Sequence, residues 1–295
     1  MRITRIICVA LATAGLLLIG TQFRSTPEAS ASVLHAARPG CSNESLRGNY
    51  GFQTRGTIVG FGPIVGVALV SFDGEGNFTQ TDNVSVNGFP PVVNRPGSGT
   101  YSVNLDCTGT QTLNTGSQVV DTTFVIAANG NEIFDEVTDL HNGVTDLHTV
   151  ITGVGKRVAL ADDEEDEDSS LRTCSLETVK GAYGTSTTGS IVAGGPVGPV
   201  ADVGKITFDG NGGASQTTTV SLNGTIVKDR SSLAGTYTVS PDCTGELSLT
   251  LPGPTGPILS TFRFVIVESG NELLLVNTGL GRALAGIATR QHLRK

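Results

Sequence analysis

The chain contains two copies of one sequence pattern. Residues 41–51 (CSNESLRGNYG) return as residues 174–184 (CSLETVKGAYG). Two further motifs return in the same order: Phe-Asp-Gly-x-Gly at 72–76 and 208–212, and Gly-Thr-Tyr-x-Val followed by Asp-Cys-Thr-Gly at 99–109 and 235–245. Internal repetition at this period predicts two copies of one domain. The repeat constrains the architecture more than any other feature does, while it leaves the function open.

The N-terminal residues have the physical pattern of an export signal. Arg2 and Arg5 precede an apolar run at 6–20, and Ala-Ser-Ala at 29–31 matches an A-x-A cleavage site. The apolar run of about 15 residues is shorter than the roughly 20 that a membrane-spanning helix needs. We therefore predict a secreted, periplasmic or cell-surface protein with no membrane span after cleavage. An uncleaved membrane anchor is the alternative.

Four cysteines remain after cleavage: Cys41, Cys107, Cys174 and Cys243. They contain no C-x-x-C pair, so they are not spaced as metal ligands. Each copy holds two of them at matched places, and the simplest pairing is Cys41 with Cys107 and Cys174 with Cys243. An oxidising compartment permits such disulfides. The alternative is a pair of buried free thiols in each copy.

The formal charge of −8 comes mostly from one acidic run, 162–168, which holds seven carboxylates. The rest of the chain carries −8 + 7 = −1. Because there is no basic patch and no tryptophan, nucleic-acid binding is not expected. Like charges repel, so the run is typical of an extended, solvated spacer. Calcium capture is the alternative, although the Gly-containing alternation of an EF-hand loop is absent.

Each copy has the pattern of β-structure throughout, because no helical apolar period persists and Asn-Gly or Asp-Gly turns separate alternating runs. The strands expected in the first copy lie near 48–57, 65–72, 77–86, 99–103, 108–114, 120–127, 131–140 and 144–157. Those expected in the second lie near 181–191, 202–208, 213–222, 233–239, 244–251, 259–267, 270–276 and 283–290. Short connections favour a meander, and barrel closure removes exposed edges.

The fold prediction is therefore an all-β chain of two tandem eight-stranded antiparallel up-and-down β-barrels, with one disulfide each and an acidic linker. An open sandwich is the competing architecture. The expected segments are a signal peptide at 1–31, a disordered segment at 32–40, repeat 1 at 41–158, the linker at 159–172 and repeat 2 at 173–291.

The repeated motifs, Cys-x-x-Glu-x-Leu/Val-Arg/Lys-Gly-x-Tyr-Gly, Phe-Asp-Gly-x-Gly, Gly-Thr-Tyr-x-Val and Asp-Cys-Thr-Gly, resemble those of exported bacterial proteins of unknown function. Those proteins look like allene oxide cyclase-type barrels, relatives in shape of the lipocalins. The resemblance covers about 41–158 and 174–291. It implies a fold and carries over no catalytic residue, because none of a plant cyclase's working positions is matched here.

Three matched pairs of polar residues are candidate functional groups: Asp73 and Asp209, Glu132 and Glu272, and Tyr101 and Tyr237. The aspartates precede glycines, where a carboxylate bonds its own backbone more often than it binds calcium. The glutamates face either a barrel interior, as general acids, or water at the start of a strand. The tyrosines are expected to pack or to bond a backbone group.

One constellation belongs to the first copy alone: Asp139, His141, Asp146 and His148 around Asn142-Gly143. A two-residue type I′ turn would place these four side chains on one face of a hairpin and set Asp139 opposite Asp146. A divalent cation such as zinc would relieve that repulsion, and Asp and His are suitable ligands. The alternative, which we favour, is a solvated outer face of a protruding hairpin.

The functional prediction is an exported, non-enzymatic protein that binds a small apolar molecule inside a barrel or an extracellular protein partner, without a cofactor. An eight-stranded barrel is just wide enough to hold one small ligand or to be filled by side chains. Two alternatives stay open: a cyclase- or isomerase-like enzyme that uses a barrel cavity, and a structural or surface-interaction module with filled barrels. A cavity favours ligand binding, and a filled interior favours the last alternative.

Overall fold

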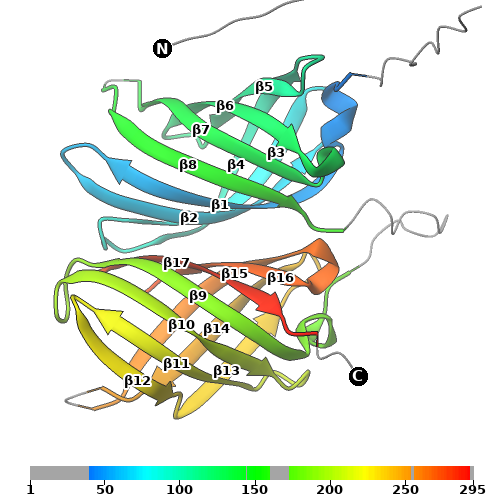
Figure 1. Ribbon diagram of the computed structural model, residues 1–295. Coiled ribbons are helices and arrows are strands. Elements are labelled where there is room, and N and C mark those ends of the chain that lie inside the picture. Colours follow the sequence, from blue (N-terminus) through cyan, green and yellow to red (C-terminus); the bar gives the residue numbers. More distant parts are fainter. Residues whose placement is uncertain (1–39, 144, 160–172, 254–255, 293–295) are drawn as a thin grey trace, which may run out of the picture. The chain divides into compact units, whose positions relative to one another are not determined.

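The computed structural model describes residues 40–143, 145–159, 173–253 and 256–292 (Figure 1). The expected signal peptide, the segment up to residue 39 and the acidic run lie outside these residues. In the described ranges, no helix is both long enough and apolar enough to cross a membrane.

The first repeat forms a closed antiparallel barrel, which we call barrel 1. Its strands are β1 (Gly48–Ile58), β2 (Gly62–Phe72), β3 (Asn77–Val86), β4 (Val92–Val103), β5 (Thr108–Asn114), β6 (Val119–Ala127), β7 (Glu132–His141) and β8 (Thr149–Arg157). Each strand pairs with the next along the chain, and β8 pairs back with β1, with Phe52 opposite Gly155. The predicted eight-stranded up-and-down barrel is confirmed for this repeat.

The second repeat forms a nine-stranded antiparallel sheet, which we call sheet 2. Its strands are β9 (Gly181–Ile191), β10 (Gly198–Phe208), β11 (Ala214–Leu222), β12 (Thr225–Ser231), β13 (Ala234–Val239), β14 (Thr244–Leu251), β15 (Ile258–Val267), β16 (Glu272–Asn277) and β17 (Arg282–Arg290). The order runs β12-β11-β10-β9-β17-β16-β15-β14-β13.

Sheet 2 corrects the prediction of a second eight-stranded closed barrel. The strand that corresponds to β4 is divided at Ser232 and Leu233 into β12 and β13. These two strands form the two opposite edges of the sheet. An isolated bridge between Gly213 and Thr236 takes the place of the continuous ladder that would close a barrel. The second repeat has one residue more than the first between its Arg and its Gly-Thr-Tyr motif, so one strand cannot stay in register with β11 throughout.

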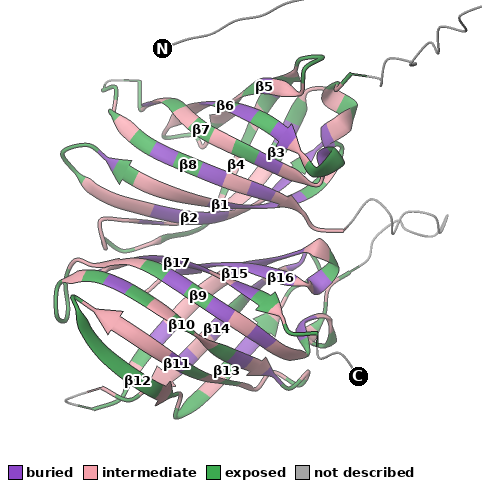
Figure 2. Ribbon diagram, viewed as in Figure 1, coloured by how far each residue is buried: buried purple, intermediate pink, exposed green. Residues whose placement is uncertain are grey.

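Side chains alternate between the interior and the surface along the strands, as Figure 2 shows. In β6, for example, Thr122, Phe124 and Ile126 are buried, whereas Thr123 and Val125 are exposed. The inward aromatic rings gather around Phe72, whose ring centroid lies 5.0 Å from that of Tyr101 and 5.5 Å from that of Tyr50. These edge-to-face contacts form the core of one half of barrel 1.

The short helical turns lie at one end of barrel 1, which we call the closed end (right in Figure 1). There η1 (Asn43–Leu46) places Leu46, which is fully buried, beneath the barrel, and η2 (Ala128–Gly130) connects β6 to β7. Sheet 2 has matching turns, η4 (Leu176–Val179) and η5 (Glu268–Gly270), with Val179 fully buried. The opposite end of barrel 1, which we call the turn end, carries the connections 59–61, 87–91, 115–118 and 142–148.

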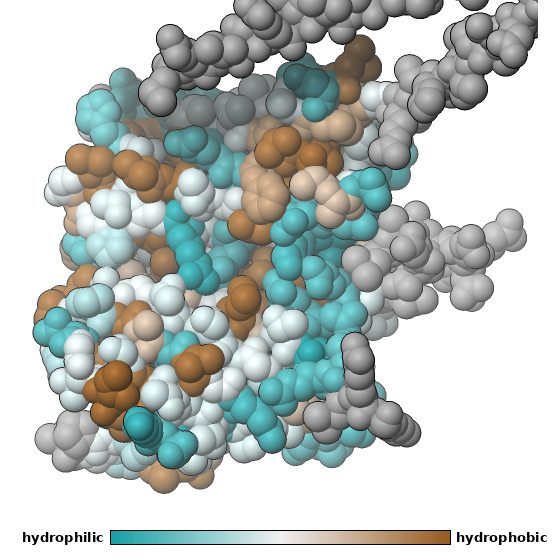
Figure 3. Space-filling model, viewed as in Figure 1, coloured by the Kyte–Doolittle hydropathy of each residue, from teal (hydrophilic) through white to brown (hydrophobic). Residues whose placement is uncertain are grey.

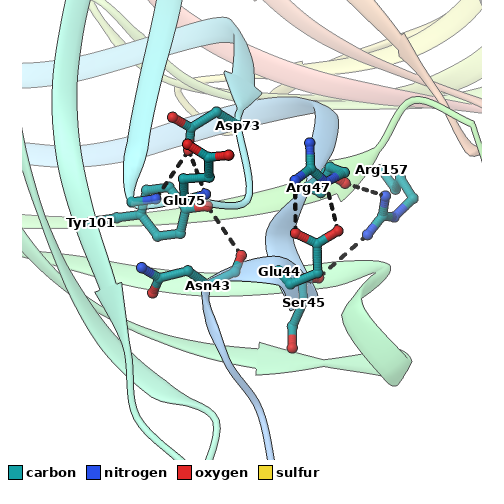
Figure 4. A network of polar contacts seen from close by, with 9 residues as sticks. Asn43, Glu44, Ser45, Arg47, Asp73, Glu75, Tyr101 and Arg157 are labelled. Carbon is teal, nitrogen blue, oxygen red and sulfur yellow. Dashed lines mark hydrogen bonds and ion pairs between the residues drawn. The ribbon is translucent and has the colours of Figure 1, made fainter.

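Polar contacts fasten η1 to the closed end (Figure 4). Arg47 pairs with Glu44 at 2.6 Å, and Arg157 of β8 donates to the carbonyl oxygen of Arg47 at 2.7 Å. Tyr101 donates to the carbonyl oxygen of Asn43 at 3.0 Å. The repeated sequence motifs therefore meet at this end, where they close the barrel.

Sheet 2 repeats these contacts with its own residues. Lys180 pairs with Glu177 at 2.8 Å, Arg290 donates to the carbonyl oxygen of Lys180 at 2.6 Å, and Tyr237 donates to that of Leu176 at 3.1 Å. The sequence similarity between the repeats is thus a similarity of their closed ends.

Each repeat holds one disulfide, as predicted. Cys41 is bonded to Cys107, and Cys174 to Cys243, with Cα–Cα separations of 4.9 Å in both. In each case the bond ties the segment before the short helical turn to the β4–β5 or β13–β14 connection. Closing loops of this length stabilises a fold by about 4 kcal/mol in the chain-entropy treatment.

The outer faces of the two repeats contact each other. Val65 and Val67 of β2 belong to a buried apolar cluster with residues of β15, β16 and β17. Gln53 of β1 donates to the carbonyl oxygens of Leu275 at 3.0 Å and Gly286 at 2.6 Å. These contacts bury outward-facing side chains of β1 and β2 and leave the interior of barrel 1 to its inward-facing residues.

Candidate functional site

Barrel 1 contains a cavity of about 250 Å³ that is partly open to solvent. Phe52 and Val70 lie on its side toward the aromatic core, and Ile58, Val86 and Leu140 lie toward the turn end. Apolar side chains form most of its wall. The cavity therefore occupies the half of the barrel that the repeated motifs do not fill.

Small inward-facing residues create this space. Gly66 and Ala68 of β2 face the interior between Ile64 and Val70 and fill little of it. On β8, a Cβ atom at Gly153 would lie 2.1 Å from an oxygen of Asp135, so only glycine leaves room for that carboxylate. The void thus follows from residue size at a few positions rather than from a wider barrel.

A charged pair crosses the cavity wall between β3 and β4. Arg95 donates to the two carboxylate oxygens of Asp82 at 3.0 and 2.8 Å, and to the amide oxygen of Gln118 at 3.0 Å. The Asp82 side chain is 6% exposed and that of Arg95 is 20% exposed. Since a bidentate pair of this kind neutralises both ions, Asp82 and Arg95 add polarity to the cavity without net charge.

Asp135 of β7 has no such partner. It faces the cavity beside Gly153, and it has no ion pair among the residues that the structure describes. Burial raises the pKa of its carboxyl to about 6, against the opposing effect of backbone hydrogen bonds from Gly153 and from its own amide. Some accessible surface remains, because the carboxyl lies against the cavity. The cavity therefore contains one uncompensated acid.

Thr122 lies on the neighbouring strand, on the same inward face as this acid. Thr122 pairs with Val137 in the β6–β7 ladder, so it is a diagonal neighbour of Asp135 on the inward face, with a backbone separation of about 7–8 Å. The residue is 6% exposed, and its Oγ1 has no hydrogen-bond partner within the described part of the chain. A buried hydroxyl without a partner costs free energy that a bound polar group would recover.

Sheet 2 has bulky apolar residues where barrel 1 has these polar ones. The matched ladders align Phe124 with Phe264, which places Phe262 at the position of Thr122 and Leu275 at that of Asp135. Counting from the matched Cys-Thr-Gly motifs, Leu247 corresponds to Gln111. Leu247 and Leu275 belong to the buried core of sheet 2, and Phe262 packs against it. The two repeats therefore differ in residue type at these positions, where barrel 1 is hollow.

Sheet 2 has a different inward acid, Asp202, at the position of Gly66. Burial raises the pKa of Asp202 to about 6, while a hydrogen bond from Thr187 and the charge of Arg230 oppose the shift. Arg230 pairs with Thr218 in the ladder as Arg95 pairs with Asp82, and each arginine follows a residue of positive φ, Asp229 or Asn94. Both repeats thus direct an arginine inward at the same place.

The sequence prediction missed these inward polar residues. It considered only Glu132 and Glu272 as acids inside a barrel, yet strand alternation from buried Phe78 leads to Asp82, and from buried Ile133 to Asp135. The matched arginines were also visible, as Asn94-Arg95 and Asp229-Arg230 before each Gly-Thr-Tyr motif.

Neither glutamate that was weighed as an interior acid lies inside a barrel. Glu272 is buried, and its carboxylate lies 3.0 Å from the Lys156 ammonium group of barrel 1, on the outer side of sheet 2. Glu132 pairs with Lys156 in the β7–β8 ladder, on the face opposite to that of buried Ile133.

The matched aspartates and tyrosines have backbone partners. Asp73 accepts hydrogen bonds from the amides of Glu75, Gly76 and Asn77, and Asp209 accepts from those of Asn211 and Gly213. Tyr101 and Tyr237 donate to carbonyl oxygens of η1 and η4. All four belong to the closed ends.

The structure brings three of the four hairpin residues together. Oxygen and nitrogen atoms of Asp139, His141 and Asp146 lie within 4.8 Å of one another, and His141 Nδ1 is 3.0 Å from Asp139. His148 is exposed and does not belong to this group. The expected shared face is present, since Leu140 points inward between Asp139 and His141.

The register of this hairpin differs from the two-residue turn that the sequence suggested. His141 forms a bridge with Asp146, and the Leu147 amide donates to the carbonyl oxygen of Leu140, so four residues separate the strands. The side chain of Asn142 accepts a hydrogen bond from the Thr145 amide, which favours the wider turn. As a result His141, rather than Asp139, is opposite Asp146, while Asp139 is opposite the carboxylate-bearing Asp121 in the β6–β7 ladder.

Apolar surface residues occur in small groups. On the face drawn in Figure 3 they lie among hydrophilic and neutral residues. At the turn end of barrel 1, Val59, Phe61 and Phe89 are more than half exposed, and the two phenylalanine rings stack with centroids 5.6 Å apart. Apolar residues thus line the rim as well as the cavity.

Comparison with known proteins adds no functional information. No protein-family description and no curated protein matches the chain. Among solved structures, the chain is similar to a protein of unknown function from the DUF3598 family of Nostoc punctiforme PCC 73102, with 11% identity and a TM-score of 0.24 over 86% of this chain and 99% of that one. A similarity of this size supports no argument about fold or function.

Proposed function

We propose that the protein binds a small, mostly apolar molecule inside barrel 1. The cavity of about 250 Å³ carries this proposal, because closely packed protein interiors contain few voids of such size. An engineered apolar cavity of about 150 Å³ holds benzene, so this one suits a molecule of roughly ten non-hydrogen atoms. Its apolar wall with a few placed polar groups is the usual composition of a ligand pocket.

Sheet 2 supports the proposal by contrast. Its repeat has the same closed end, disulfide and inward arginine, yet Phe262 and Leu275 take the places of Thr122 and Asp135. A shared scaffold whose interior residues differ at the cavity is what two domains with different tasks require. We propose that barrel 1 holds the ligand and that sheet 2 supports it through the apolar contacts of β2.

An enzyme that uses the cavity is the second candidate. The observation that favours it is the raised pKa of Asp135, since perturbed acids are typical of active sites. A general base also needs an opposing group to stabilise developing charge. Within the described lining, the other charged groups are Asp82 and Arg95, and they neutralise each other. We therefore propose binding rather than catalysis.

We further propose that the protein is exported and related in shape to lipocalin-like, allene oxide cyclase-type barrels of bacteria. The two disulfides support export, because such bonds persist in oxidising compartments. The barrel and the motifs at its closed end support the likeness of shape.

A divalent-metal site at Asp139, His141 and Asp146 is a separate proposal. The proximity of three ligand atoms supports it, and the site lies on the outer face of the hairpin, away from the cavity. The alternative is a solvated outer face on which His141 contacts Asp139. In that case zinc and chelator should give the same melting temperature.

Non-denaturing mass spectrometry of the protein exported by its own host, without reductant, tests the main proposal. The expected result is an additional small-molecule mass that is released on activation. The Ala68→Leu variant, which fills part of the cavity, should lose that mass, whereas Ala201→Leu on the exposed face of β10 should retain it. A bare mass for the wild-type protein would instead support a surface-interaction module.

A further inference from the structure

We propose that the ligand of barrel 1 is an amine, with an apolar body and one protonated nitrogen that donates hydrogen bonds to Asp135 and Thr122. This inference rests on the proposed ligand-binding function and specifies its chemistry. It depends on the placement of one unpaired acid and one unpaired hydroxyl on neighbouring strands of the same cavity wall.

The charges of the cavity favour a cation. Its charged lining residues in the described chain are Asp82, Arg95 and Asp135. The first two form a bidentate pair, so the cavity has a net charge of −1 whenever Asp135 is ionised. A buried carboxylate without a cation is costly, and a bound ammonium group would offset that cost by direct pairing. An anionic ligand would meet repulsion from Asp135, and the nearest arginine is already occupied.

The hydrogen-bonding capacity of the site agrees with an ammonium group. Thr122 Oγ1 is buried without a partner, and a hydroxyl oxygen has lone pairs that accept N–H donors. Asp135 accepts backbone hydrogen bonds from Gly153 and its own amide, which leave further acceptor positions on its two oxygens. An ammonium group has three donors, so one nitrogen between β6 and β7 would satisfy both side chains.

The elements around Asp135 offer no competing cation. Phe124 is opposite it on β6 and Gly153 is opposite it on β8, and neither carries a charge. Arg95 lies on β4, where its guanidinium contacts Asp82 and Gln118. Arg157, the basic residue of β8 nearest the closed end, donates to the carbonyl oxygens of Arg47 and Ser45. The cavity space in front of the Asp135 carboxyl group is therefore left for a ligand.

Calorimetric titration of the full chain with three probes of one shape tests this inference. The probes are 2-phenylethylamine, 2-phenylethanol and phenylacetate. At pH 7.5 the amine should bind at least about tenfold more tightly than the alcohol, as expected for a charge-assisted hydrogen bond, and the acid should bind most weakly. On lowering the pH to 5, the preference for the amine should shrink, because Asp135, with its pKa raised to about 6, takes up a proton.

Variants separate this account from a general effect on folding. Asp135→Asn should abolish the preference for the amine over the alcohol. Asp202→Asn, the same change inside sheet 2, should leave both affinities unaltered. Thr122→Val should weaken amine binding by about three- to tenfold.

The outcomes are distinguishable. Equal binding of alcohol and amine, or a preference that survives Asp135→Asn, would overturn the inference and leave ligand binding intact. Failure of all three probes to bind, together with a bare mass of the host-exported protein, would overturn the proposed function itself.

Discussion

Asp135 in barrel 1 and Leu275 in sheet 2 occupy the same position of the repeat. Each is paired with the matched phenylalanine of the preceding strand, Phe124 or Phe264. Leu275 belongs to a packed core, whereas Asp135 faces a cavity. This inward position is therefore one of those that distinguish a filled interior from a hollow one.

Replacing the polar residues of barrel 1 by their counterparts should fill it. We expect Thr122→Phe with Asp135→Leu to abolish ligand binding and to stabilise the chain by about 1–3 kcal/mol, because a buried acid is removed and the void is reduced. Chemical denaturation and calorimetric titration measure the two effects. The single change Asp135→Leu controls for overpacking by phenylalanine. A double variant that still binds the wild-type ligand would show that the site lies elsewhere.

Stability should decrease as the pH rises from 4 to 6.5. Burial raises the pKa of Asp135 and of Asp202 to about 6 in the folded state, against an ordinary value of 3.8. Both acids hold their protons more tightly when folded, so they favour folding at low pH and lose that advantage as the pH passes 6. For Asp135 the loss is at most about 3 kcal/mol. Asp135→Asn should flatten this part of the profile, and an unchanged slope would contradict the assignment.

Below pH 4 the trend should reverse. Hydrogen bonds from the side chain and amide of Asn77 lower the pKa of Asp73 to about 2. Its contribution to stability is complete above pH 4 and is lost as the pH falls toward 2. Denaturation midpoints across the pH range should therefore show a maximum near pH 4. Asp73→Asn should reduce the acid decline, whereas Asp106→Asn would leave the contribution of Asp73 in place.

The two closed ends should respond alike to the same change. Tyr50 donates to the carbonyl oxygen of Gly130, and Tyr183 donates to that of Gly270 at 2.8 Å. Tyr50→Phe and Tyr183→Phe should each destabilise the chain by about 1–2 kcal/mol, since each leaves a buried carbonyl less well satisfied. Ligand affinity should stay constant in both, because the rings lie outside the cavity lining. A loss of binding in Tyr50→Phe alone would link the closed end to the site.

Zinc tests the hairpin cluster. If Asp139, His141 and Asp146 hold the ion, zinc at about 100 times its dissociation constant should stabilise the fold by about 2.7 kcal/mol and raise the melting temperature. His141→Ala should remove the shift, whereas His148→Ala should retain it. An identical melting temperature in zinc and in chelator would assign the cluster to the solvated outer face.

The sequence predicted the closed ends well and the cavity poorly, for one physical reason. Motifs that recur, such as the cysteines and the tyrosines Tyr50 and Tyr183, form the same contacts twice and are visible as repetition. A void is set by the residues that differ, such as Gly66 against Asp202 and Thr122 against Phe262. Whether side chains from eight strands fill the space between them depends on their packing in three dimensions, which alternation along one strand does not reveal.

The strand count shows a similar limit. The expected strand at 233–239 corresponds to β13, but β12 was not expected, because Thr225–Ser231 is almost entirely exposed and lacks apolar alternation. Pairing with β11 stabilises it instead. The hairpin register was likewise decided by the Asn142 side chain rather than by the Asn-Gly dipeptide.

A crystal structure of the protein purified from its own host would show directly whether barrel 1 holds a ligand. We expect electron density for one small molecule within barrel 1, enclosed by Phe52, Ala68 and Leu140, with a nitrogen against Asp135 and Thr122. Interior density for water alone, or side chains packed across the cavity as in sheet 2, would contradict the claim that barrel 1 is a binding site.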